Sequence, residues 1–241
     1  GNHAAALARA AALRGIAAHI VMPRNAPKPK QQAVAGYGGR IVFCEPTLEA
    51  RESTCAAVIA ATGATLIHPY NDYRIIAGQA TAAVELLEDV PELDIVIVPV
   101  GGGGLLSGTA IAVKSLCPGA IVFGAEPQQA DDAAESLRAG KIVSKPAHTI
   151  ADGLRTMLGD RTFPIIRANV AGIQTTSEEA IVAAMRRIWE VLKLVVEPSG
   201  AVPYAVIREH PRGFAGKRVG IILSGGNVDL DALPWLTRQE H

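Results

Sequence analysis

The feature that most constrains the fold of this chain is an apolar segment that runs directly into four glycines. Residues 94–100 read Asp-Ile-Val-Ile-Val-Pro-Val, and glycines occupy positions 101–104. A run of apolar residues of this length is typical of a β-strand that is buried on both faces, as strands of parallel sheets are. Such strands alternate with helical segments along the 241 residues, which predicts an α/β fold with parallel sheets.

Hydrophobic periodicity and breaker residues predict the other elements. We expect strands at residues 18–22, 40–44, 64–67, 94–100, 121–125, 170–175 and 219–223. We expect helices at residues 4–13, 48–62, 75–88, 107–116, 131–139 and 178–192, and one more helix with Pro203 near its start. Residues 27–36 predict a turn that leads into another helix, which the glycines at positions 36, 38 and 39 end. Residues 140–163 have no regular pattern. A loop after His68 and Pro69 separates residues 1–70, a small α/β domain, from residues 71–241, a large one.

Composition and charge argue against several classes of function. Lys and Arg number 23 and so do Asp and Glu, and no basic stripe is evident, so we expect no nucleic acid partner. The apolar runs are too short to span a bilayer, and we therefore expect no membrane association. The three cysteines form no CxxC pair, which favours reduced thiols and a cytoplasmic location.

The glycine run predicts a phosphate site. Glycine leaves the backbone free, so that successive N–H groups can converge on one anion. The helix that follows adds its unpaired amides and the positive end of its dipole, at the sheet edge where α/β proteins bind ligands. The lysine-containing GxxxxGK[ST] loop of nucleotide-binding proteins is absent. A flexible glycine loop without a ligand remains the alternative.

Two more strands end in polar residues. Ser224-Gly225-Gly226-Asn227 follows the last strand, and the Ser224 hydroxyl could donate to a ring nitrogen or merely cap the next turn. Spacing alone leaves both possibilities open. Glu126, with a backbone carbonyl and the acidic residues that follow, could hold a hard divalent cation, although solvated charges at a helix start are the commoner outcome.

Taken together, these segments resemble the fold-type II enzymes that use pyridoxal 5′-phosphate (PLP), most closely the serine racemase and threonine (serine) dehydratase family. The resemblance covers essentially the whole chain. It is carried by Gly1-Asn2-His3-Ala4, Gly36-Tyr37-Gly38, Ala77-Gly78-Gln79, the glycine run, Ile150-Ala151-Asp152-Gly153, Glu197-Pro198-Ser199-Gly200-Ala201 and Ser224-Gly225-Gly226-Asn227. It implies two open parallel-sheet domains of the tryptophan synthase β type, with PLP in the cleft between them, and a homodimer.

The resemblance also implies roles for individual residues. The ring hydroxyl of PLP would bind Asn2, the pyridine nitrogen would face Ser224, and the ring would lie against the backbone of Gly153. The phosphate would be bound by Gly101, Gly102, Gly103, Gly104 and Leu105. Mg²⁺ or a similar cation would be bound by Glu126, the carbonyl of Ala130, and Asp132.

The chain departs from the family at the catalytic lysine. Relatives attach PLP to a lysine in a Ser-Phe-Lys-x-Arg-Gly type motif upstream of the Gly-Asn-His segment, and these residues contain no such motif. We therefore expect no catalytic residue in this chain, a Schiff-base lysine upstream of Gly1, and a fragment that is inactive alone. Smaller departures are Ala80, where many relatives have glycine, and Tyr70, in a loop that relatives often fill with smaller polar residues.

For the intact protein, the resemblance implies an ammonia-lyase that converts L-threonine or L-serine, a small amino-acid substrate, to a 2-oxo acid and ammonia. A serine or aspartate racemase on the same fold is the first alternative. A non-catalytic chain that binds PLP or another phosphate is the second.

Overall fold

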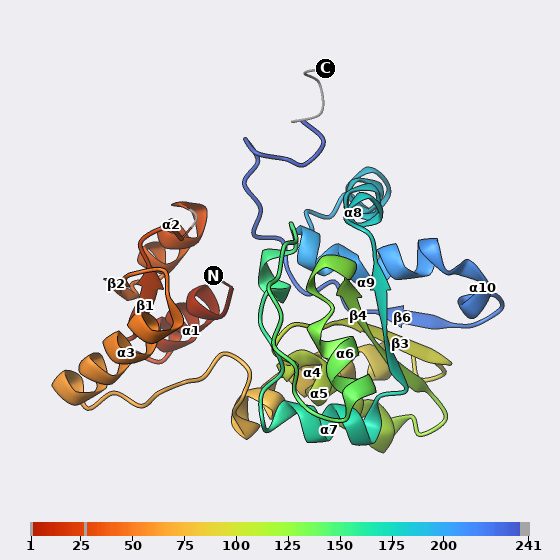
Figure 1. Cartoon of the computed structure of the whole chain (residues 1–241), viewed down its shortest axis with the longest axis horizontal. Coiled ribbons are helices and arrows are strands. Elements are labelled where there is room, and N and C mark those ends of the chain that lie inside the picture. The colour runs from red at the N-terminus through yellow and green to blue at the C-terminus, as the bar shows by residue number, and fades with distance from the viewer. Residues whose placement is uncertain (1, 27, 237–241) are drawn as a thin grey trace. The chain divides into compact units, whose positions relative to one another are not determined.

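The computed structural model describes residues 2–26 and 28–236 (Figure 1). Gly1, which opens the Gly-Asn-His segment, lies outside the described residues, as do Pro27 and residues 237–241. The chain divides into two compact units. Unit 1 contains the described residues up to Ile67 together with Asn227–Asp231, and unit 2 contains His68–Gly226 and the described residues from Ala232 onward. No helix in the described ranges combines the length and the apolarity that crossing a membrane requires.

Unit 1 is built on a pair of parallel strands. Its elements are α1 (Asn2–Leu13), β1 (His19–Pro23), α2 (Lys28–Gly36), β2 (Arg40–Cys44) and α3 (Leu48–Thr62). The strands pair in parallel with Ile20 opposite Ile41. Alanines on one face of α1 pack with Ile20, Met22 and Val34, and the small alanine side chains allow the helix to approach the sheet closely.

The strand expected at residues 64–67 does not form. This segment carries no strand hydrogen bonding, and the two-stranded sheet of unit 1 consists of β1 and β2 in the described residues. Leu66 is 53% exposed, so the apolar character that suggested a buried strand is not matched by burial. An extended segment becomes a strand only when a neighbour accepts its backbone hydrogen bonds.

Unit 2 contains a parallel sheet of four strands in the order β5-β4-β3-β6. The strands are β3 (Ile95–Pro99), β4 (Ile121–Pro127), β5 (Gly172–Thr176) and β6 (Val219–Ile221). The α-helices are α4 (Tyr73–Asp89), α5 (Gly104–Leu116), α6 (Asp132–Ala139), α7 (Thr162–Asn169), α8 (Glu178–Leu192), α9 (Pro198–Glu209) and α10 (Pro211–Phe214). Two single 3₁₀ turns, η1 (Gln128–Ala130) and η2 (Asp152–Leu154), complete the list.

Helices cover both faces of this sheet. Helices α4, α5 and α7 gather on one side of the strands and α8 and α9 on the other, as Figure 1 shows. All five residues of β3 are buried, as expected for a central strand of a parallel sheet. Helices α4 and α5 pack closely at Gly108, where an added Cβ would lie 2.4 Å from the carbonyl oxygen of Ile76.

Two expectations about unit 2 need correction, and the sequence did not predict every helix. Helix α5 starts at Gly104 and not at residue 107, so the last glycine of the run already belongs to the helix. Helix α7 was not expected from the sequence. Pro203 lies inside α9, because that helix begins earlier, at Pro198. Because Pro203 has no backbone N–H, α9 lacks one hydrogen bond that another residue at this interior position would make.

Candidate functional site

The glycine run forms a loop of unpaired amides at the carboxyl end of β3. The amide of Val100 donates to Ala125 O, and the next recorded backbone donor is Ser107, whose amide donates to Gly103 O. In the described ranges, the amides from Gly101 to Leu106 have no recorded acceptor, and the four glycines are buried. Buried N–H groups without acceptors are rare and costly in proteins. An anion such as a phosphate would satisfy them, at the positive end of the α5 dipole.

Three of the four glycines are constrained in different ways. Gly103 has φ +88°, a left-handed conformation that favours glycine. Gly102 is required by contact, because a Cβ there would lie 2.3 Å from ring carbons of Tyr70. A Cβ on Gly104 would lie 3.0 Å from the Cβ of the same tyrosine. The sequence argument relied on backbone freedom alone and did not anticipate this packing.

Tyr70 belongs to a segment that is fixed on both sides. The amides of Tyr70 and Asn71 both donate to Nδ1 of His68, at 3.3 and 2.9 Å. The Asn71 side chain donates to Asp160 and accepts from the amide of Arg161. This segment therefore lies between the glycine loop and the turn that precedes α7.

The turn before α7 is itself bonded to the loop. The Thr162 hydroxyl, fully buried, lies 2.8 Å from the carbonyl oxygen of Gly102, to which it donates. Thr162 and Tyr70 thus shape the loop without belonging to a recognisable motif. Only Tyr70 had a sequence signal, as a departure from the family pattern.

Gly153 lies beside the glycine loop. A Cβ on Gly101 would lie 3.1 Å from Gly153 O and 3.0 Å from the Cα of Leu154, so the two backbones are in close contact. The amide of Gly153 donates to the Ser199 hydroxyl oxygen at 3.1 Å. Ser199 is a second residue that sequence reasoning missed as part of the site, although it lies in one of the quoted family segments.

Ser224 follows β6, the neighbour of β3, and is exposed. Because the two strands are parallel, their carboxyl ends reach the same edge of the sheet. The structure therefore brings Ser224 to the edge where the glycine loop begins. Its hydroxyl is accessible to a ligand at that edge.

Asn2 lies in unit 1, at the start of α1. Its side-chain oxygen accepts a hydrogen bond from the Asn227 amide at 2.9 Å. His3, to which no role was assigned, donates from Nε2 to Ile67 O at 3.0 Å. The candidate cofactor residues of unit 2 and Asn2 thus belong to different units.

The three candidate metal ligands are close in sequence and buried. Each carboxylate oxygen of Glu126 accepts an amide from the first turn of α6, from Ala133 and Ala134, both at 3.0 Å. Burial raises the pKa of Glu126 to about 8, against the opposing effect of these amides. Burial also raises the pKa of Asp132 to about 6. Asp132 Oδ2 has no hydrogen-bond partner in the described part of the chain.

This chemistry fits a hard cation. A divalent ion would neutralise two carboxylates that burial disfavours as anions, and it would give the Asp132 oxygen a partner. No cluster of three or more His, Cys, Asp and Glu side chains suited to a metal exists among the described residues. A cation at Glu126 and Asp132 would therefore also need carbonyl ligands, such as Ala130 O, or water.

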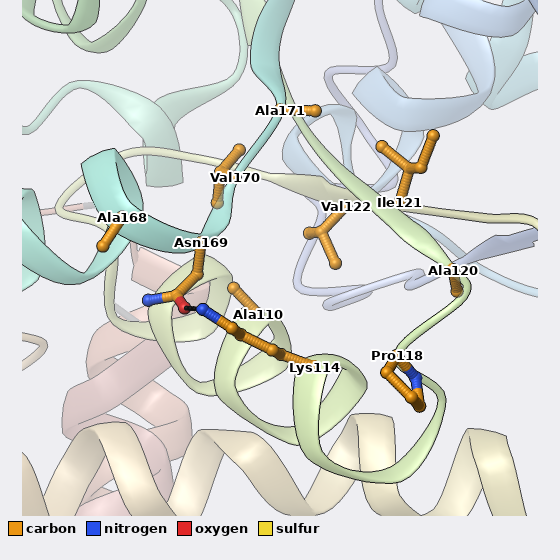
Figure 2. Close-up of a pocket in the computed structure, with 10 residues that line it drawn as sticks. All are labelled: Ala110, Lys114, Pro118, Ala120, Ile121, Val122, Ala168, Asn169, Val170 and Ala171. Atoms are coloured by element: carbon orange, nitrogen blue, oxygen red, sulfur yellow. Dashed lines mark hydrogen bonds between the residues drawn. The ribbon is translucent and has the colours of Figure 1, made fainter.

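A surface hollow of about 340 Å³ lies at the opposite edge of the sheet (Figure 2). It is formed where β4 and β5 begin, between α5 and the end of α7. Figure 2 shows the Lys114 ammonium pointing to the Asn169 oxygen, which it reaches at 3.0 Å. The Asn169 amide donates in turn to Ile165 O, so both polar groups serve the local structure. None of the candidate cofactor residues lines this hollow.

The lysines with described partners in unit 2 bond residues outside the glycine loop. Lys114 bonds Asn169 at the far edge, Lys145 pairs with Asp131 and Glu135, and Lys193 donates to Glu190 O.

Comparison with known proteins identifies the family. Residues 1–225 match the family model described as "Pyridoxal-phosphate dependent enzyme". The chain is 52% identical to the beta-hydroxyaspartate dehydratase of Paracoccus denitrificans, over 98% of this chain and 75% of the relative. The structure of maize serine racemase superposes with a TM-score of 0.93 at 49% identity, over 98% of this chain and 74% of that one.

A third protein extends the comparison to deaminases. The threonine deaminase of T.th. superposes with a TM-score of 0.90 at 45% identity, over 95% of this chain and 76% of that one. These matches confirm the α/β fold and the resemblance drawn from the sequence. The chain therefore belongs to the pyridoxal-phosphate dependent enzymes of fold type II, in the family of serine racemases and dehydratases.

Proposed function

We propose that the full-length protein is a PLP-dependent ammonia-lyase that acts on L-serine or L-threonine, with release of a 2-oxo acid and ammonia. The observation that carries this proposal is the row of amides from Gly101 to Leu106, which lack recorded acceptors in the described ranges and suit a phosphate. All of these residues except the half-buried Leu105 are buried. Bound PLP supplies the electron sink that chemistry at the α-carbon of an amino acid needs.

In this proposal the protein's own residues bind and orient. The amides of Gly101 to Gly104 and of Leu105 would hold the phosphate, and the backbone of Gly153 would support the ring. Ser224 would offer the pyridine nitrogen a neutral hydroxyl in place of a carboxylate. The side-chain amide of Asn2 would donate to the ring hydroxyl, and the side-chain oxygen of Asn2 accepts a hydrogen bond from Asn227.

The proposed cation binds Glu126, Ala130 O and Asp132. The buried carboxylates with raised pKa values support this assignment, because a cation would stabilise their charged forms. Its role would be to stabilise unit 2, since Glu126 ties the end of β4 to the first turn of α6.

The substrate class is an amino acid with a hydroxyl on its β-carbon. Serine, threonine and β-hydroxyaspartate, which appear in the names of the relatives, share this group. Racemisation of serine is the second candidate, and the similarity to a serine racemase supports it equally well. A homodimer is part of the proposal, and sedimentation velocity would test it.

One assay separates the candidates. The full-length protein is incubated with PLP and Mg²⁺ and with L-serine or L-threonine in turn, and 2-oxo acid, ammonia and the D-amino acid are all measured. Equal amounts of 2-oxo acid and ammonia support the lyase, whereas D-serine without 2-oxo acid would replace it by the racemase. PLP binding without either product would favour a non-catalytic phosphate-binding role, and no PLP binding would refute the proposal.

A further inference from the structure

The segment of residues 149–155 carries Gly153 and contacts the glycine loop backbone to backbone. A Cβ on Gly101 would lie 3.0 Å from Leu154 Cα and 3.1 Å from Gly153 O. Backbone atoms cannot rotate away as a side chain can. A displacement of Gly153 of a few tenths of an ångström would therefore be transmitted directly to the first glycine of the loop.

Hydrogen bonds to other parts of unit 2 and within the segment hold these residues in place. The amide of Ile150 donates to the Glu178 carboxylate at 2.9 Å, at the start of the segment. The Arg155 guanidinium donates from Nε to Thr149 O at 2.9 Å and closes the segment on itself. A further bond, from the Gly153 amide to Ser199 Oγ at 3.1 Å, is the one that acts at Gly153.

Ser199 is well placed to fix the position of Gly153. It is 2% exposed and lies in the first turn of α9. Four residues later comes Pro203, which has no N–H to donate to the Ser199 carbonyl. The first turn of α9 is consequently held less by its own helix than an ordinary turn would be, and more by its contacts with neighbouring segments.

The same turn of α9 also contacts the Ser224 segment. The amide of Glu197 donates to Gly225 O at 3.0 Å. A Cβ on Gly200 would lie 3.0 Å from Gly225 O and 3.3 Å from the amide nitrogen of Ser224. One helical turn therefore lies against both of the segments that carry Gly153 and Ser224.

We propose that Ser199 is a positioning residue, which sets Gly153 against the glycine loop and, through the first turn of α9, in register with Ser224. The inference rests on the proposed function, because that function supplies the cofactor that these segments contact. Ser199 itself needs no contact with the cofactor. Its effect is on the geometry of the two segments, and so on the affinity and the electronic environment of bound PLP.

The test uses the full-length protein and the variant Ser199→Ala. Hydrogen exchange in the peptide containing Gly153 should become faster, because the Gly153 amide loses its acceptor. The dissociation constant of PLP should rise about tenfold, equivalent to about 1.4 kcal/mol, and the absorption and fluorescence spectra of bound PLP should shift. Ser199→Thr, which keeps the hydroxyl, should restore exchange protection, affinity and spectra.

The matched control is Thr176→Val, which also removes a buried hydroxyl with a hydrogen bond, here to Glu209 at 2.6 Å. It should lower thermal stability and leave PLP affinity and spectra unchanged. If wild type binds PLP and Ser199→Ala binds it equally tightly with the same spectra, the positioning role is refuted while the proposed function stands. If Thr176→Val weakens PLP binding as much as Ser199→Ala, the effect is general destabilisation and the inference is again refuted. If wild type does not bind PLP, the proposed function fails and the inference fails with it.

Discussion

Replacing Gly102 with alanine tests the packing that shapes the glycine loop. The added Cβ would lie 2.3 Å from two ring carbons of Tyr70 and 2.5 Å from a third, well inside van der Waals contact. The ring cannot simply move away, because the backbone of Tyr70 is bonded to His68 and the next residue, Asn71, is bonded to Asp160. Either the loop or the whole segment of residues 68–71 must shift.

The expected cost follows from overpacking. Insertion of a methyl group into a well-packed interior typically costs about 1–3 kcal/mol. Because the clashing atoms belong to a flat ring on a fixed backbone, we expect Gly102→Ala to cost about 2 kcal/mol in the free energy of unfolding, roughly a thirtyfold change in the equilibrium constant. PLP affinity should fall about tenfold or more, since the displaced amides are those assigned to the phosphate.

The assay is urea denaturation with and without PLP, with two comparison variants. Gly78→Ala makes the same substitution inside α4 where no atom lies within 4 Å, and it should stabilise the protein by about 0.5–1 kcal/mol. In a Tyr70→Ala background, Gly102→Ala should cost little, because the clashing ring is gone. An equal cost in both backgrounds, or a Gly102→Ala protein as stable as Gly78→Ala, would refute the reasoning.

Three more predictions concern the candidate site. In EDTA, the raised pKa of Glu126 means that the folded protein retains a proton which the unfolded chain, with an ordinary pKa of 4.5, releases. The free energy of unfolding should therefore fall as pH rises from about 4.5 to about 8, by at most about 1.4 kcal/mol per pH unit. Urea titrations at several pH values should show a weaker pH dependence of this free energy in Glu126→Gln than in the wild type. An equal pH dependence in both proteins would contradict the raised pKa of Glu126. Asp132→Ala should abolish stabilisation by Mg²⁺ in a thermal melt, whereas an undiminished Mg²⁺ effect would exclude Asp132 as a ligand. Ser224→Ala should lower turnover with PLP still bound, as measured by the 2-oxo acid assay, and wild-type turnover would remove Ser224 from the mechanism.

The sequence predicted the elements whose signal is local. The strand ending at Val100 is a continuous apolar run, and α8 has a serine cap, Ser177, whose oxygen accepts the Ala180 amide. Helix α7 was missed because its first residue, Thr162, is held by a bond to Gly102, which is distant in sequence. The segment of residues 64–67 has the composition of a strand, but composition cannot supply the neighbouring strand that pairing requires.

The candidate site was predictable to a similar extent. A run of glycines in a sequence indicates a site formed by backbone amides, and the loop from Gly101 to Gly104 was proposed as a phosphate site for that reason. The contributions of Tyr70, Thr162 and Ser199 depend on distances between segments that only the folded chain brings together. All the assigned roles stay predictions: those of Asn2, Gly101 to Leu105, Gly153 and Ser224 towards PLP, and those of Glu126, Ala130 and Asp132 towards a cation.

Unit 1 is formed by two segments that are far apart in the chain, and this has a consequence for folding during synthesis. This unit contains the described residues up to Ile67, yet it also includes Asn227–Asp231, and Asn227 bonds Asn2 across 225 positions of sequence. A ribosome releases the N-terminal part of a protein first, and domains often fold as they emerge. Most of unit 1 is translated before unit 2, yet unit 1 must wait for residues 227–231, which are translated after residues 68–226. We therefore expect it to acquire its full protection from proteases last, after the unit that follows it in the chain.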